Sequence, residues 1–189
     1  MRAFEVHTGT GAPLERNDVD TDQIVPKQFL RRIERSGYGE FLFFDWMKDG
    51  AFVLNLPQYK GASILVAGRN FGCGSSREHA VWALEDAGFR VIVACSFADI
   101  FYSNACKVGV LPVKLTETEV AQLQHLIKAR PESEITVDLR EQRVRAEDFG
   151  AGFEIEPFTK DRLLFGLDEV GLVMQHEALI AAYEQSHLG

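Results

Sequence analysis

The middle of the chain alternates between continuous apolar runs and segments in which apolar residues recur at helical spacing. The runs "ASILVAG" (62–68), "RVIVACSF" (90–97) and "VLPVKL" (110–115) predict buried strands. Between them, a pattern starting after Ser75 and stopping at Gly88, and the segment 98–109, predict helices. Thr116 and Glu119 form a capping box that opens a third helix. The succession strand, helix, strand, helix, strand predicts a parallel βαβαβ core with right-handed crossovers.

The flanking segments have other periodicities. "EITVDLR" and "RVRAE" alternate apolar and polar residues and predict a β-hairpin, and "FEIEPF" (153–158) is a candidate further strand. In the first 60 residues, "FLFFDWM" (41–47) and "AFVLNL" (51–56) predict strands, and the segment "LIAAYEQS" predicts a helical C-terminal tail. Because no repeat or low-complexity linker interrupts the chain, we expect one compact α/β domain over residues 1–189, its parallel core flanked by antiparallel strands.

Composition narrows the possible functions. Apolar residues make up 46% and charged residues 25%, which is ordinary for a globular protein, and no apolar run approaches the roughly 20 residues that span a bilayer. The net charge of −8 disfavours a nucleic-acid partner, RNA included, because phosphate binding needs clustered cations. The N-terminus lacks an apolar secretory signal, so we expect a cytoplasmic protein without a membrane partner.

Three cysteines, Cys73, Cys95 and Cys106, raise the question of a metal site. Three thiolates can hold an iron–sulfur cluster. However, no Cys-x-x-Cys pair is present, and two of the residues fall in a predicted strand and a predicted helix, so we expect free buried thiols and no metal on this chain. The histidines, also, show no pair at ligand spacing.

The stretch "GRNFGCGSSREHA" (68–80) is the strongest candidate site. It follows a predicted strand and opens a predicted helix, with Ser75 and Glu78 placed as a capping box. Gly72 and Gly74 would let backbone amides approach a ligand, and Arg77 adds a planar donor suited to a carboxylate. One interpretation is an anion site at a helix N-terminus. The other is that the serines are only caps and the glycines only turn residues. Nucleotide-binding motifs fit poorly, since the P-loop lysine and the third glycine of a dinucleotide fingerprint are both missing.

Three strings identify a family. "NFGCGSSREHA", with "DVDTDQIVP" upstream and "SFADIFYSNA" downstream, resembles the small subunits of the 3-isopropylmalate dehydratases, which correspond to the aconitase swivel domain. The resemblance covers nearly the whole chain. It implies a swivel-type fold and a hydro-lyase of leucine biosynthesis that interconverts 2- and 3-isopropylmalate through an alkene. It also implies a heterodimer with a large subunit that carries a four-iron four-sulfur cluster, with no cofactor on this chain.

The resemblance also implies roles for individual residues. Ser75 would be the catalytic base, and Ser76 and Arg77 would bind substrate carboxylates. A serine alkoxide becomes plausible where a helix N-terminus and an arginine stabilise the anion in a closed site. A second segment, "KQFLRRIERSGYG" (27–39), resembles the substrate-recognition loop of the family, in which Arg31 and Arg32 would face the group that distinguishes one malate from another. These arginines are alternatively surface charges.

Other polar residues have supporting roles in this interpretation. Asp18, Asp20 and Asp22 alternate along the chain, but without the glycine and distal glutamate of a calcium loop. We therefore expect Asp20 and Asp22 to shape the turn and support the loop. Glu78 and His79 are candidates for loop or backbone support in the helix first turn.

One segment departs from the family pattern. Where the family usually has an Arg-Lys-His-Cys run, "EPFTKDRLLFGLDEVG" (156–171) has other residues. It is either a tolerant surface helix or a sign of a different large subunit or substrate. The alternatives are therefore a related hydro-lyase acting on citramalate, methylmalate or a homoaconitate-type substrate, or a non-catalytic anion-binding module.

Overall fold

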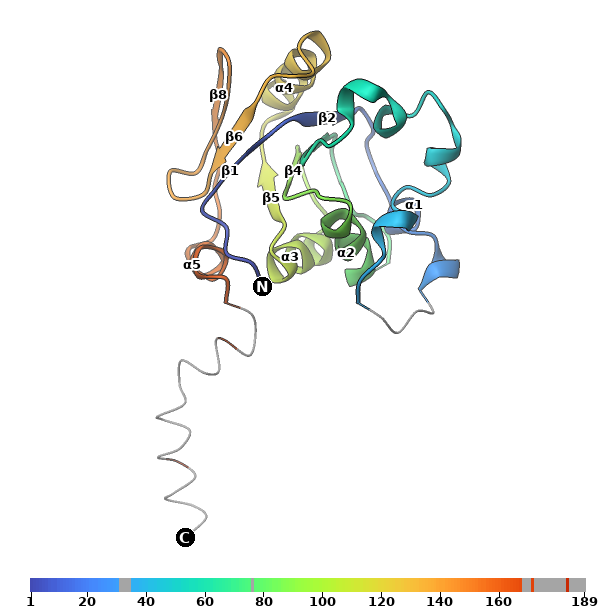
Figure 1. Ribbon diagram of the computed structural model, residues 1–189. Helices are drawn as coiled ribbons and strands as arrows, with labels where there is room; N and C mark the ends of the chain where they lie inside the picture. The colour runs from blue at the N-terminus through green and yellow to red at the C-terminus, as the bar shows by residue number, and fades with distance from the viewer. Residues whose placement is uncertain (31–34, 76, 168–170, 172–182, 184–189) are drawn as a thin grey trace.

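The computed structural model describes residues 1–30, 35–75, 77–167, 171 and 183 (Figure 1). Within these residues the strands form two four-stranded sheets, one parallel and one antiparallel. The α/β class predicted from the sequence is therefore confirmed.

The parallel sheet forms the centre of the molecule. Its strands follow the chain in the order β2 (Gly11–Leu14), β3 (Ile64–Ala67), β4 (Val91–Ala94) and β5 (Leu111–Lys114). All residues of β2, β3 and β4 are buried, as expected when helices cover both faces of a sheet. The three continuous apolar runs were thus correctly predicted to be buried strands.

Three helices follow β3, β4 and β5 along the chain and pack on the parallel sheet. They are α2 (Glu78–Asp86), α3 (Asp99–Val108) and α4 (Glu117–Ala129). Figure 1 shows α2 and α3 together on one side of the sheet, whereas α4 packs against β2 and β3 on the other. The capping box of Thr116 and Glu119 is present at the start of α4, and Gly109 ends α3 in the left-handed conformation, with φ = 103°.

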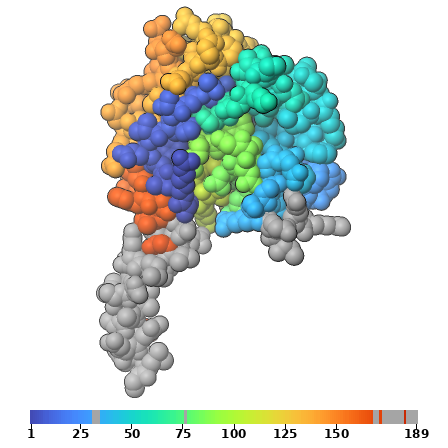
Figure 2. All heavy atoms as spheres, viewed as in Figure 1, coloured from blue at the N-terminus to red at the C-terminus, as the bar shows by residue number. Residues whose placement is uncertain are grey.

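The antiparallel sheet has the order β1 (Val6–Gly9), β6 (Ile135–Asp138), β7 (Arg143–Ala146) and β8 (Phe149–Gly152). The predicted hairpin is confirmed as β6 and β7, in which Val137 pairs with Val144. The chain passes from β1 to β2 through a single residue, Thr10, so the two sheets adjoin at this point. In Figure 2 the antiparallel sheet and the segment of residues 39–60 lie on opposite sides of the molecule.

The strands predicted at 41–47 and 51–56 are wrong. Between β2 and β3, the described residues instead form one short helix and five 3₁₀ turns. These are α1 (Thr21–Ile24), η1 (Lys27–Phe29), η2 (Gly39–Phe41), η3 (Trp46–Lys48), η4 (Val53–Asn55) and η5 (Pro57–Tyr59). Phe43 stacks on Trp46 with ring centroids 5.2 Å apart, and Phe52 meets the edge of Phe43 at 5.7 Å. A strand would send alternate side chains to opposite faces, whereas the turns direct these rings into one cluster.

The strand predicted at 153–158 is also misplaced. The actual strand, β8, ends at Gly152, and helix α5 (Pro157–Phe165) begins where the prediction had strand. The Glu156 carboxylate accepts hydrogen bonds from the amides of Phe158 and Thr159 and caps this helix, and Pro157 occupies its first position. Apart from Tyr183, the residues of the predicted tail helix "LIAAYEQS" lie outside the described residues.

Among the described residues, no helix combines the length and the apolar character needed to cross a bilayer.

Candidate active site

The candidate site is built on one loop, residues 70–77, which lies between two other segments of the chain. On one side, the amides of Gly72 and Cys73 donate to the carbonyl of Val19, at 2.8 and 3.1 Å. On the other side, the Phe71 amide donates to the Ser96 carbonyl and the Phe71 carbonyl accepts from the Ala98 amide, both at 3.0 Å. Backbone hydrogen bonds therefore hold the loop between the entry to α1 and the entry to α3.

The two glycines of this loop are required by close packing. Gly72 and Gly74 have φ values of 76° and 87°, in the left-handed region that favours glycine. A Cβ on Gly72 would overlap the Phe101 ring, and one on Gly74 would overlap the Asp20 carboxylate. The amide of Gly72 itself donates to the Val19 carbonyl, so it is already engaged within the protein.

The predicted capping box of Ser75 and Glu78 is wrong. Helix α2 begins at Glu78, and Arg77 occupies the N-cap position without a capping hydrogen bond from its side chain. The reason is that the preceding loop is tied to α1, since the Thr21 hydroxyl donates to the Ser75 carbonyl at 2.9 Å and the Thr21 amide donates to the Cys73 carbonyl at 2.9 Å. These bonds place Ser75 outside the helix, with its side chain exposed.

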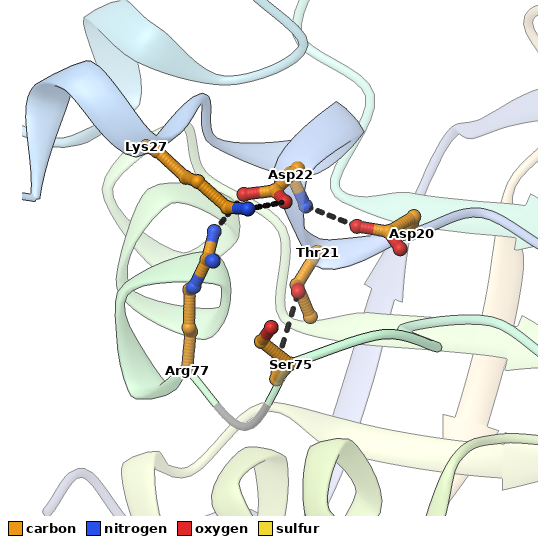
Figure 3. Close-up of polar contacts among 6 residues, drawn as sticks. All are labelled: Asp20, Thr21, Asp22, Lys27, Ser75 and Arg77. Carbon is orange, nitrogen blue, oxygen red and sulfur yellow. Dashed lines mark hydrogen bonds and ion pairs between the residues drawn. The ribbon is translucent and has the colours of Figure 1, made fainter.

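Helix α1 supplies the charged partner of the site (Figure 3). The Asp20 carboxylate caps α1 by accepting from the Asp22 amide at 2.6 Å, and the Gln23 side chain completes a capping box. The Asp22 carboxylate then forms an ion pair with the guanidinium of Arg77, and its other oxygen lies 3.3 Å from Nζ of Lys27. Arg77 is 12% exposed, so the pair is largely shielded from solvent on that side.

A cavity of about 220 Å³ opens at this position. Thr21, Ser75 and Arg77 line one side of it, and the first turn of α3, residues 98–101, lines the other. The N-termini of α2 and α3 thus both reach the cavity, and the amides of a helix's first turn, together with its dipole, favour a negative charge there. Such an arrangement is suited to bind a carboxylate beside a serine hydroxyl.

Side chains from other segments contact the first turn of α2. The Glu78 carboxylate accepts from Arg35 at 2.9 Å and from the Trp82 indole at 3.3 Å. The His79 ring packs against Tyr38 and Trp82, with centroids 5.2 and 4.6 Å away, and burial lowers the pKa of His79. The structure thus brings together Asp20, Asp22, Gly72, Gly74, Ser75, Arg77, Glu78 and His79, while Ser76, Arg31 and Arg32 lie outside the described residues.

Sequence reasoning missed three contributors, Thr21, Lys27 and Arg35. The string "DTDQ" placed Thr21 between the two aspartates, and this was the available signal for it. Lys27 and Arg35 are surface-type residues in a polar segment, and only the tertiary contacts distinguish them from other surface charges.

The cysteines do not form a metal site in the described part of the chain. No group of three potential ligands occurs among the described residues. Cys106 is buried as predicted, whereas Cys73 and Cys95 are only half-buried. Desolvation raises the pKa of all three thiols, that of Cys106 to about 12, and so disfavours the thiolate form that ligates iron. These residues do not fit an iron–sulfur cluster.

Comparison with known proteins agrees with this geometry. The model of the aconitase C-terminal domain matches residues 1–118, and the chain therefore belongs to this family. The 3-isopropylmalate dehydratase small subunits of Acidobacterium capsulatum and Brevibacillus brevis are 54% and 53% identical to it. These alignments cover 100% and 97% of this chain and 92% and 98% of the relatives. Within the family, the chain belongs with the 3-isopropylmalate dehydratase small subunits.

A solved structure extends the likeness. The 3-isopropylmalate dehydratase structure from Methanocaldococcus jannaschii is 26% identical and has a TM-score of 0.69, covering 94% of this chain and 99% of that one. The swivel-type fold implied by the sequence resemblance is thereby confirmed.

Proposed function

We propose that this chain is the small subunit of a 3-isopropylmalate dehydratase and that it acts only in complex with a large subunit. The reaction is the interconversion of 2- and 3-isopropylmalate by loss and re-addition of water through an alkene. The observation that carries the proposal is the joint placement of Ser75 and Arg77 on one cavity at two helix N-termini. The similarity to small subunits over the full chain supports it.

In this proposal, Arg77 binds a substrate carboxylate and Ser75 moves the proton. The Ser75 hydroxyl oxygen, as the alkoxide, takes the proton from the carbon next to the carboxylate, and it returns a proton when water adds back. Deprotonating a serine is costly in water, so the site must stabilise the anion. Arg77 and the amides at the start of α2 and α3 supply that stabilisation without reorganising. Ser76 is proposed to assist in binding the carboxylate.

Removal of the hydroxyl is assigned to the partner. The thiols of this chain do not fit an iron–sulfur cluster, so we propose that the four-iron four-sulfur cluster lies on the large subunit. The steps proposed for this chain are confined to carboxylate binding and proton transfer.

The test is turnover by the complex of this chain with a large subunit. Turnover is measured from the absorbance of the conjugated alkene intermediate. Ser75→Ala should lower kcat by about 10²–10⁴-fold, the usual contribution of a general base. Because Ser75 caps no helix, this variant should keep the stability of the wild type. Ser103→Ala, an exposed serine on α3, is the matched control. Wild-type turnover by Ser75→Ala would exclude Ser75 as the base, and turnover by the chain alone would refute the two-subunit proposal.

We further propose that Arg31 and Arg32 select the substrate. Their stems would pack on an alkyl group, or their guanidinium groups would bind an additional carboxylate. Arg31→Ala and Arg32→Ala should therefore alter the ranking of isopropylmalate, citramalate and a longer homologue, by about 1–3 kcal/mol. By contrast, Arg77→Lys should impair all three substrates, because lysine lacks the bidentate fork. Equal losses on all substrates in both loop variants would refute the selection role.

A further inference from the structure

Asp22 contacts two cations, and this has consequences for the charge of the cavity (Figure 3). One carboxylate oxygen pairs with Arg77, and the other lies 3.3 Å from Nζ of Lys27. Among the described residues that line the cavity, Arg77 is the only cation, and Asp99 is an anion. The residue proposed to bind the substrate carboxylate is thus already paired with a carboxylate.

The charge balance decides whether an anion is attracted. Arg77 and Asp22 cancel, whereas Asp99 in the cavity wall and Asp20, whose carboxylate lies against Gly74, leave about two negative charges. The two helix N-termini offset this by roughly half a charge each, so the sum without Lys27 is about one negative charge. Lys27 adds one positive charge at the Asp22 carboxylate and brings the sum close to zero, so that a substrate anion is no longer repelled.

The backbone that carries Lys27 is fixed in place. Lys27 is the first residue of η1, and its carbonyl accepts from the Leu30 amide at 3.1 Å. Two residues on, Phe29 stacks on Phe41 with centroids 4.0 Å apart and meets the edge of Phe44 at 4.8 Å. The anchored turn therefore keeps the ammonium group, at the end of a side chain that is 70% exposed, within reach of Asp22.

We propose that Lys27 is a positioning residue for substrate binding: by pairing with Asp22, it leaves Arg77 with enough positive field to bind a substrate carboxylate. This inference rests on the proposed function. It extends the site to a residue that does not line the cavity, and it concerns the carboxylate shared by all alkylmalates. Lys27 should accordingly affect carboxylate binding more than proton transfer, because the Ser75 alkoxide is also stabilised by the amides of two helices.

The test uses the reconstituted complex with Lys27→Met, Lys27→Arg and the control Lys48→Met. Lys48 is a comparable surface lysine, 62% exposed and paired with Asp45 at 2.6 Å. KM and kcat are measured for isopropylmalate and citramalate at low and high ionic strength. Lys27→Met should raise KM about 3- to 10-fold for whichever substrates the wild type turns over, and any fall in kcat should be smaller than the rise in KM. The increase should shrink at about 0.5 M salt, because salt screens exposed charges. Lys27→Arg and Lys48→Met should behave as the wild type.

Several results would overturn the inference while the proposed function stands. These are an unchanged KM in Lys27→Met, a loss confined to kcat, or a loss of the same size at high salt. Affinity for the large subunit is measured separately by calorimetry, and a KM that returns to normal when that subunit is saturating would make Lys27 an interface residue instead. A wild-type complex that turns over no alkylmalate would instead refute the proposed function.

Discussion

Gly74→Ala tests how the active-site loop is supported. Gly74 has φ = 87°, and a Cβ there would lie closer than 3.0 Å to all three atoms of the Asp20 carboxyl group. Asp20 caps α1, and α1 carries Thr21, which binds the Ser75 carbonyl. The added methyl group must therefore displace either the cap or the loop.

Two contributions set the magnitude. An alanine in the left-handed region costs about 1–2 kcal/mol relative to glycine. Displacing the Asp20 side chain removes a helix cap, worth roughly 0.5–2 kcal/mol. Gly61 separates the two terms, because its φ of 82° is nearly the same but its added Cβ would meet nothing within 4 Å. Gly61→Ala should show the first cost only, so Gly74→Ala should be less stable than Gly61→Ala by about 0.5–2 kcal/mol.

Urea denaturation of the two variants and the wild type measures this difference, and turnover by the reconstituted complex measures its effect on function. Gly74→Ala should also lose activity, because the Ser75 loop moves with α1, whereas Gly61→Ala should remain active. Equal stability of the two variants, or full activity in Gly74→Ala, would refute the account of the loop as a segment fixed by the Asp20 contact.

Three other measurements address the surroundings of the site. Burial lowers the pKa of His79 below its ordinary 6.5, so the neutral ring contributes stability that is complete above this pH and is lost as the pH falls through the folded pKa. His79→Gln should therefore reduce the fall of Tm below about pH 6.5. An unchanged curve of Tm against pH would show that His79 does not cause this fall. A double-mutant cycle between Arg35 and Glu78 should give a coupling of about 0.5 kcal/mol, small because Arg35 is 71% exposed, and the absence of coupling at low salt would show that the pair is not formed. A thiol reagent at about pH 8 should modify half-buried Cys95 before buried Cys106, whose pKa burial raises to about 12, and equal rates would indicate that the core opens there.

Much of the fold could be predicted from local pattern. The parallel strands β3, β4 and β5, the cap of α4 at Thr116 and the end of α3 at Gly109 follow from features within a few residues of each other, whereas the fourth parallel strand, β2, was not predicted. The loop 68–80 was likewise recognisable, because its glycines, serines and arginine are adjacent in sequence. The local sequence is enough to predict an element where the interactions that stabilise it join residues close together in the chain.

The rest depended on contacts between distant segments. The aromatic-rich region around Phe43 has the composition of a strand, yet it forms 3₁₀ turns because its rings pack into one cluster. Similarly, Ser75 and Glu78 have the spacing of a capping box. They do not form one, because the hydrogen bond from Thr21 holds Ser75 outside helix α2. The pairing of Asp22 with Arg77 spans 55 positions, and no periodicity within either segment encodes it. Sequence therefore determined which residue types gather in the loop, whereas tertiary packing decided which of them are paired, because hydrogen bonds and ion pairs depend on distance in space.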